Sequence, residues 1–328
     1  MKSRLISLLA FILGLGLFAY VVRQTGWQVI GGKIRQVGWG FIAILILSFL
    51  RHWVRSVSWR RCMAPEQRRV GIASLLRARL AGEAAGDLTI GPLVAEPLRL
   101  VMLGREVPLA AGISSLSVEN LTYAFSSGLM IVLGVTALLA TIGLDESMRA
   151  GMQLALAVVM LLIAGSALAI ARRWALLSGV AAWVASRLPA GVKPGFEGQI
   201  EKLRELESYI LDFFATRPSD FLAVMGCQIT FHLAGVGEIY LTLRLLGIDL
   251  SLWSAFILES VNRAINIAFV FVPGLIGVDE AGSGLMTGLL GWGATAGVTL
   301  AIVRKLRMLF WIAVGLIFLA AGGRKRPG

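Results

Sequence analysis

The chain has 328 residues, of which 57% are hydrophobic and only 15% are charged. A soluble domain carries about a quarter charged residues, so this composition excludes an ordinary soluble protein. The net charge is +12, but the basic residues stand between apolar runs, where they set membrane topology, and we expect no nucleic-acid binding. The two cysteines and two histidines lack the spacing of metal ligands, which argues against a metal site. The sequence contains no P-loop pattern, so a nucleotide site is not indicated either, and we expect no cofactor.

Apolar runs close to the roughly 20 residues that cross a bilayer recur along the chain. They predict six spanning helices, at 5–22, 40–54, 111–142, 152–171, 221–246 and 295–321. Two further apolar regions, 74–103 and 252–290, are interrupted by Gly, Pro and charged residues. Each leaves only about 15 residues per arm, so we predict two broken re-entrant hairpins, although a pair of full spans would satisfy the same topology. The predicted fold is an all-α polytopic membrane protein with two inverted, pseudo-symmetric halves.

The predicted organisation is one integral membrane domain over residues 1–328. Its first half covers 1–171, a connector covers 172–217, and the second half covers 218–328. Arginines and lysines gather at 51–79, in the connector and in the C-terminal tail. The positive-inside rule places these segments and the N-terminus in the cytoplasm, which predicts a multi-pass protein of the bacterial inner membrane. Residues 198–215 predict an amphipathic helix on the cytoplasmic surface, with a solvated connector helix as the alternative.

The two interrupted regions share a pattern of an acid among small or polar residues, then a Pro–Gly break, then a second acid. In order, the residues are Glu83 with Asp87, Gly91-Pro92 and Glu96 in the first region, and Glu259, Pro273-Gly274 and Glu280 in the second. A broken helix frees backbone polar groups and presents partly charged helix ends. Interrupted segments at matching positions in two inverted halves therefore indicate a transporter binding site.

Charges within the bilayer must pair, take up a proton or face a water-filled cavity, because each costs about 2.5–3.5 kcal/mol at the centre of a helix. We predict a substrate-binding cavity between the hairpins and no catalytic residue. Its predicted residues are Glu83, Asp87, Pro92, Glu96, Arg99, Glu119, Glu259, Arg263, Asn266, Pro273, Gly274, Gly277, Glu280, Arg304 and Arg307. Structural alternatives stay open: Arg99 has the spacing of a local ion pair with Glu96, and the basic residues at 304–307 either contact a phosphate or neutralise acids.

The order of these motifs resembles the transmembrane, flippase-like family of lysylphosphatidylglycerol synthase, over about residues 41–319. The resembling segments are AGE and PLVAEPLR, then ES and FVPGLIGVDEAG, and finally AIVRKLRMLFWIAVGL. The pattern is most similar to the hopanoid-biosynthesis-associated branch. Two positions depart from it: Ala95 stands where the family often has Gly, and Asp87 adds a charge where the branch often has a small or amide residue. The soluble aminoacyl-transferase domain of the synthases is missing, so we expect no aminoacylation of lipid.

The resemblance implies a lipid transporter or flippase-like protein that moves or presents an amphipathic lipid across the inner membrane. It implies as substrate a hopanoid or another polyisoprenoid lipid, or an anionic phospholipid. The alternatives are an integral-membrane lipid-modifying enzyme, for which no nucleophile or metal cluster is visible in a polar loop, and an accessory scaffold of a lipid-biosynthesis complex. We expect a non-enzyme that binds membrane lipids, with lipid-biosynthesis enzymes or a second copy of the chain as protein partners.

Overall fold

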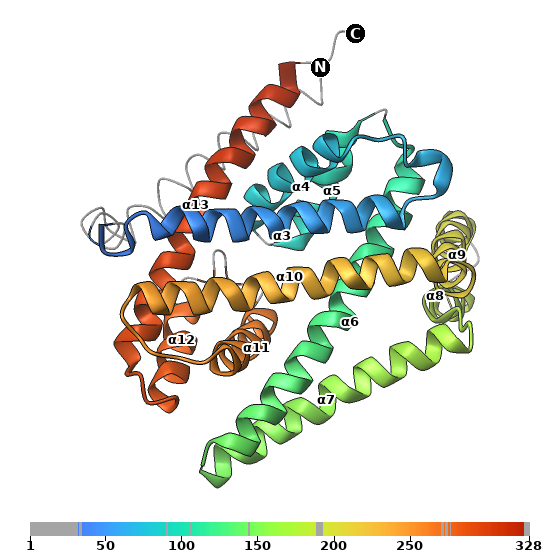
Figure 1. The fold of residues 1–328 in the computed structure, drawn as a ribbon. Coiled ribbons are helices and arrows are strands. Elements are labelled where there is room, and N and C mark those ends of the chain that lie inside the picture. The colour runs from blue at the N-terminus through green and yellow to red at the C-terminus, as the bar shows by residue number, and fades with distance from the viewer. Residues whose placement is uncertain are drawn as a thin grey trace.

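The computed structural model describes residues 32, 35–89, 91–104, 106–143, 145–187, 193–269, 272, 275 and 277–324. Over these residues the chain forms α-helices joined by short connections, and no strand occurs among them (Figure 1). In order, the helices are α3 (Gly40–Cys62), the 3-10 turn η1 (Pro65–Gln67), α4 (Ile72–Asp87), α5 (Pro92–Leu103), α6 (Leu109–Thr141), α7 (Glu146–Ala171), α8 (Leu176–Ser186), α9 (Lys193–Thr216), α10 (Pro218–Leu245), α11 (Leu252–Ala268), α12 (Val278–Leu289) and α13 (Ala294–Arg324).

Four helices of the described chain, α3, α6, α7 and α10, are long and apolar enough to cross a membrane. They coincide with four of the six predicted spans, and the all-α polytopic membrane fold is confirmed. The span predicted at 5–22 lies outside the described residues. Helix α3 runs to Cys62 rather than ending near residue 54, so Arg51 and Arg55 belong to a helix. The end predicted at residue 54 was therefore too early.

Helix α13 coincides with the last predicted span but is charged near its middle, at Arg304, Lys305 and Arg307. Its 31 residues rise about 46 Å at 1.5 Å per residue. The helix packs on α12 near its start and on α4 further along (Figure 1). It therefore connects the two regions that the sequence analysis treated as hairpins.

Each interrupted region forms two short helices. Helices α4 and α5 are separated at residues 88–91, where Gly91 has a φ of 54°, and Pro92 then starts α5, a position that suits its fixed φ. Helices α11 and α12 are separated at 269–277. The four arms have 16, 12, 17 and 12 residues and rise about 18–26 Å, which is less than the roughly 30 Å of a hydrocarbon core. These lengths favour re-entrant hairpins.

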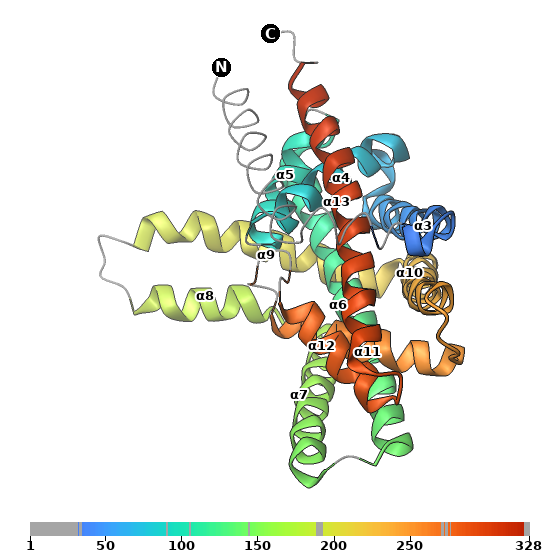
Figure 2. The same cartoon turned by 90° about the vertical axis from the view of Figure 1, so that its left-hand side faces the viewer.

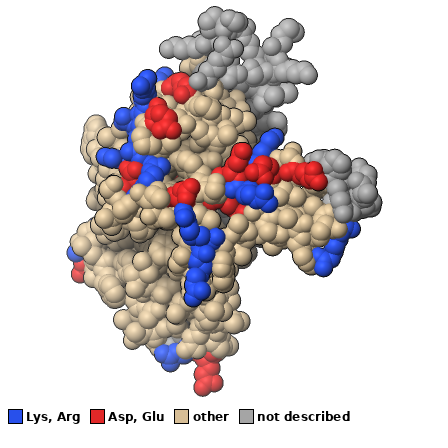
Figure 3. All heavy atoms as spheres, turned by 90° about the vertical axis from the view of Figure 1, so that its right-hand side faces the viewer, with Lys and Arg blue, Asp and Glu red and all other residues tan. Residues whose placement is uncertain are grey.

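Helices α8 and α9 form a pair that extends sideways from the other helices (Figure 2). Both lie across the ends of α7 and α10, where they are seen end-on in Figure 1. Charged side chains gather along the upper side of this pair and across the upper part of the molecule (Figure 3). The surface below is mostly uncharged until its lower tip, as expected for a face in contact with lipid.

Close packing of α13 on α4 depends on Gly315. A Cβ built at this position would lie 2.3 Å from the Leu80 carbonyl oxygen and 2.6 Å from the Ala84 Cβ. We therefore expect Gly315→Ala to lower the unfolding free energy by about 1–3 kcal/mol, because the two helices must separate. The thermal midpoint of the protein in detergent measures this effect. Gly226→Ala in α10 is the matched control, because no atom would lie within 4 Å of its Cβ; equal midpoints for the two variants would contradict the prediction.

Candidate functional site

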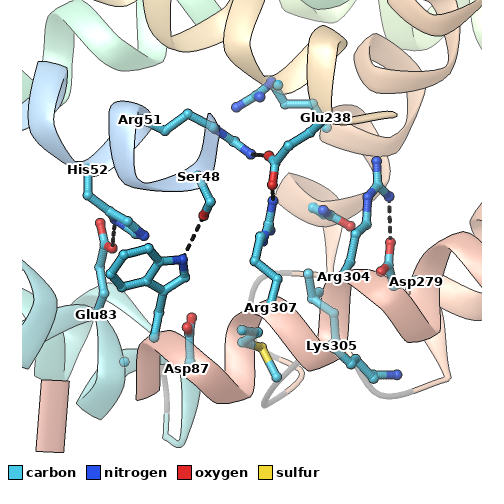
Figure 4. Close-up of a pocket in the computed structure, with 18 of the residues that line it drawn as sticks. Ser48, Arg51, His52, Glu83, Asp87, Glu238, Asp279, Arg304, Lys305 and Arg307 are labelled. Atoms are coloured by element: carbon cyan, nitrogen blue, oxygen red, sulfur yellow. Dashed lines mark hydrogen bonds and ion pairs between the residues drawn. The ribbon is translucent and has the colours of Figure 1, made fainter. Parts of the chain in front are cut away.

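A cavity of about 680 Å³ lies between the two hairpins. Side chains of α3, α4, α5, α10, α11 and α13 form most of its wall, with contributions from α6 and α12. Figure 4 shows charged side chains from several of these helices pointing into the same space. Apolar residues such as Ile44, Leu80 and Met308 complete the wall. The volume lies within the roughly 300–1,000 Å³ of small-molecule sites.

Seven basic residues of the Arg and Lys type and six acidic residues line this cavity. The basic residues are Arg51, Arg55, Arg99, Arg263, Arg304, Lys305 and Arg307, and the acidic ones are Glu83, Asp87, Glu96, Glu238, Glu259 and Asp279. An uncompensated charge in such a place costs several kcal/mol. Because basic and acidic residues are present in nearly equal numbers, most of these side chains can stay charged in the cavity as ion pairs.

Glu238 joins three helices at the centre of the cavity (Figure 4). Arg51 of α3 donates to one of its carboxylate oxygens at 2.5 Å, and Arg307 of α13 donates to the other. Glu238 itself belongs to α10. One carboxylate therefore fixes the relative positions of α3, α10 and α13.

Glu83 of α4 organises the first hairpin. One of its oxygens lies 2.7 Å from Nδ1 of His52, and the other lies 3.4 Å from Arg99 of α5. Arg99 also donates to Glu96 at 2.7 Å, which is the local pair that the spacing of these two residues allowed. Arg99 thus connects both arms of the hairpin.

Glu119 of α6 lies beside the cavity and is fully buried. Arg55 donates two hydrogen bonds to its carboxylate, at 2.8 and 2.7 Å, and Arg79 of α4 lies at 3.4 Å. Arg79 is itself fully buried. The two hydrogen bonds from Arg55 are the strong, two-point form of an arginine–carboxylate contact. Through Arg55 and Arg79, Glu119 joins α6 to α3 and to α4.

Glu259 of α11 plays the corresponding part in the second hairpin. Arg263, one turn along the same helix, donates to it at 2.5 Å, and Arg304 of α13 donates at 3.2 Å. Arg304 also donates to Asp279 of α12 at 3.1 Å. Arg263 further donates to the hydroxyl of Tyr123 on α6 at 2.9 Å. Both arms of this hairpin are therefore attached to α13 through one arginine.

Asp87 differs from the other acids of the cavity. It lies at the end of α4 and its carboxylate points into the open space (Figure 4). Glu83, Glu96, Glu238, Glu259 and Asp279 each have a basic partner, whereas Asp87 forms no ion pair with a residue that the structure describes. It interacts electrostatically with Glu83, Arg307 and Arg99 without direct contact. Asp87 is therefore the lining carboxylate that a ligand could reach without breaking an internal pair.

Most of the predicted site residues are brought together. Those that line the cavity are Glu83, Asp87, Glu96, Arg99, Glu259, Arg263, Asn266, Arg304 and Arg307. Glu119 and Glu280 are not among the lining residues; the Glu280 carboxylate contacts Lys305 and accepts a hydrogen bond from the Gly277 backbone N–H at the start of α12. Pro92 begins α5, while Pro273 and Gly274 lie outside the described residues. Whether these residues bind a substrate stays a prediction.

Several lining residues were not predicted as part of the site: Arg51, His52, Arg55, Glu238, Asp279 and Lys305. For those that belong to α3, the sequence does contain a signal. Ser48, Arg51, His52 and Arg55 recur at spacings of three and four residues, so a continuous helix places them on one face. The signal was missed because the predicted span ended at residue 54 and the arginines from residue 51 onward were counted as a basic cytoplasmic segment.

A family model for the lysylphosphatidylglycerol synthase TM region matches residues 7–315. The chain belongs to this family. The match covers both hairpins, all the cavity residues and the central part of α13, so the whole cavity is a feature of the matched region. Comparisons with curated proteins and with solved structures gave no match. Membership of the lysylphosphatidylglycerol synthase TM family agrees with an integral membrane protein linked to lipid synthesis or translocation.

Proposed function

We propose that the chain is a flippase-like lipid transporter of the bacterial inner membrane, which moves or presents an amphipathic lipid and performs no chemical step. The observation that carries the proposal is a large cavity with a charged lining, which lies among the helices of a membrane-protein fold. Hydrocarbon could not fill this space without leaving its charges unsolvated. A lipid headgroup, with attendant water, supplies the polar partners that such a space needs.

The arrangement of the hairpins supports a transport role. The arms of each hairpin are shorter than the bilayer core, and each hairpin contributes acids to the cavity wall, among them Glu83 and Glu259. Each is fastened to the remaining helices by an arginine pair, Arg79 of α4 with Glu119 of α6 in the first hairpin and Arg304 of α13 with Glu259 of α11 in the second. Exchange of partners among these pairs would let one hairpin move while the charges stay compensated, which is the requirement for alternating access.

The proposed substrates are an anionic phospholipid, or a hopanoid or another polyisoprenoid lipid, which the resemblance of the two motifs to the hopanoid-associated branch implies. The headgroup would occupy the cavity among the arginines, and the chains would extend along apolar helix faces. An anionic headgroup can exchange hydrogen bonds with arginine forks, whereas a hopanoid polar end would use hydroxyl or amine contacts. Both substrates predict lipid retained by the purified protein.

We further propose that the basic end of the molecule faces the cytoplasm, together with both termini. Asp220 at the start of α10 pairs with Arg61 and Arg68, which follow or end α3, and with Arg217 at the end of α9. This cluster brings the connection after α3 and the end of α9 to one end of the molecule. The positive-inside rule assigns that end to the cytoplasm.

Two measurements test the transport proposal. Mass spectrometry of lipids retained through gentle purification should find one lipid class enriched over the host membrane. Proteoliposomes with a fluorescent phosphatidylglycerol should lose signal from both leaflets when an impermeant reductant is added, whereas protein-free vesicles lose it only from the outer leaflet. Bulk lipid composition together with outer-leaflet loss alone would refute transport, and the appearance of a chemically altered lipid would favour an enzyme.

Variants identify the cavity as the site of transport. Thr89→Trp places a bulky side chain in the cavity wall without removing a charge, and we expect it to abolish inner-leaflet loss while the protein stays folded. Glu201→Gln is the control, because this residue lies on the exposed face of α9 in a surface pair with Arg204. Normal transport by Thr89→Trp would contradict a route through this cavity.

A further inference from the structure

Helix α8 exposes an apolar face. Its exposed large residues are Leu176, Leu177, Val180, Trp183 and Val184, with exposed fractions from 44% to 61%. Their positions repeat at one, three and four residues, so they share one side of the helix. Ser178 and Ala185 of the same helix are buried. A short helix with an outward apolar face is unusual in water and requires a partner.

Contacts with α9 fix the direction of this face. The carboxylate of Glu207 accepts hydrogen bonds from the backbone N–H groups of Leu177 at 2.5 Å and Ser178 at 2.9 Å. These are free donors at the start of α8, so Glu207 caps the helix and compensates its dipole. Arg173, just before α8, forms an ion pair with Asp212 of α9. Helix α8 therefore lies on α9 with its apolar face turned away from it.

Several apolar residues of α9 pack against other helices. Tyr209, Ile210, Phe213 and Phe214 pack in a cluster with Cys62 and Val118, so this face of α9 holds the pair on α3 and α6. Charged residues such as Glu201 and Arg204 occupy the exposed side of α9. The outward apolar face belongs to α8, which the sequence analysis did not single out.

The face of α8 points toward the same region as the lipid-exposed surface of α7. Figures 1 and 2 place α8 between α9 and the level of α7, and α7 runs away from the pair on the α8 side. Only 6% of the most apolar window of α7 is buried inside the protein. The side of α8 that faces away from α9 is thus continuous with a helix surface that lipid covers.

Arginines border the apolar face at both ends. Arg172 and Arg173 precede α8, and Arg187 follows it. The guanidinium of Arg187 lies 3.5 Å from the centroid of the Trp183 ring, a cation–π contact. Tryptophan beside arginine is typical of the membrane interface, where the ring sits at headgroup level and the cation meets lipid phosphate.

We propose that α8 is an interfacial helix that lies in the plane of the bilayer and binds an anionic lipid surface. Val180 and Trp183 sit in the acyl-chain boundary, about 5–10 Å below the headgroups, and Arg172 and Arg187 contact anionic headgroups. The helix anchors the connector between the two halves of the protein to one leaflet. This inference concerns a surface outside the cavity and does not depend on transport.

The test uses the full chain in vesicles with a spin label at Val180→Cys. We expect the label to be accessible to oxygen, which partitions into lipid, and protected from a water-soluble nickel chelate. Glu205→Cys on the exposed side of α9 is the matched control and should show the reverse. The unsubstituted chain supplies the background signal, because Cys62 is buried and Cys227 is partly buried. Equal nickel accessibility at the two positions would overturn the proposal.

The same spin label tests whether α8 prefers an anionic lipid surface. Adding phosphatidylglycerol to phosphatidylcholine vesicles should increase the protection of the label at position 180, and the increase should disappear in the Arg172→Gln/Arg187→Gln double variant. No response to phosphatidylglycerol would refute the anionic surface. Protection from both oxygen and nickel, together with dimers in light scattering, would assign the face to a second copy of the chain instead.

Discussion

Glu119→Gln is expected to destabilise the protein by about 3–5 kcal/mol, because it removes the acidic partner of two buried arginines. Arg55 would lose its two-point contact. Arg79, which is fully buried, would keep a hydrogen bond to the Arg55 carbonyl oxygen at 3.1 Å, but its nearest carboxylate would be that of Glu83, 3.8 Å away. Uncompensated charges in a low dielectric are costly, so the loss exceeds that of one ordinary hydrogen bond. Thermal or denaturant unfolding in a mild detergent measures the change.

Two controls separate this effect from a general sensitivity to loss of acid. Glu201→Gln removes an ion pair whose side chains are 59% and 58% exposed, and it should change the unfolding free energy by less than about 1 kcal/mol. Arg79→Gln combined with Glu119→Gln should cost less than the sum of the two single variants, because the second change removes a charge that the first leaves unpaired. Additive losses, or a loss for Glu119→Gln as small as that of Glu201→Gln, would contradict the predicted role of Glu119.

The sequence predicted the helical membrane fold because apolar runs of spanning length are a strong local signal. It also located both helix breaks, since Gly91-Pro92 combines a residue that tolerates positive φ with one that starts helices. The residue at which α3 ends was harder to predict. Positive charges near a span usually mark its end, but here Arg51 and Arg55 continue the helix because acids on other helices compensate them.

Partners across the cavity could not be derived from one sequence. Arg51 and Glu238 are 187 positions apart, and no local rule assigns such a pair. Glu280 shows the opposite case. Its motif resembled that of Glu96, yet it caps α12 and contacts Lys305, and it is not itself among the residues that line the cavity. The type and depth of a charged residue indicate that it needs a partner, whereas only the packing of helices decides which partner it finds.

Asp87→Asn is expected to change which lipid the cavity retains, in favour of anionic headgroups. The native carboxylate faces the cavity without an ion-pair partner in the described chain (Figure 4), so it repels a phosphate and attracts an amine. Two unit charges about 4 Å apart interact by about 1 kcal/mol in water and by about 4 kcal/mol near a protein surface, where the effective dielectric constant is lower. We therefore expect the ratio of retained phosphatidylglycerol to phosphatidylethanolamine to rise about tenfold.

Stability distinguishes Asp87 from the paired acids. Asparagine has nearly the same shape as aspartate and removes a charge that has no ion-pair partner, so Asp87→Asn should leave the unfolding free energy unchanged or increase it. Glu238→Gln should decrease the unfolding free energy, because Arg51 and Arg307 lose their shared partner. Mass spectrometry of retained lipids and thermal unfolding are measured on the same preparations, with Glu201→Gln as the control for both. An unchanged lipid ratio would remove Asp87 from the headgroup site. A fall in stability like that of Glu238→Gln would mean that its carboxylate is held by an internal partner, and a ligand would then have to break that contact before it could bind.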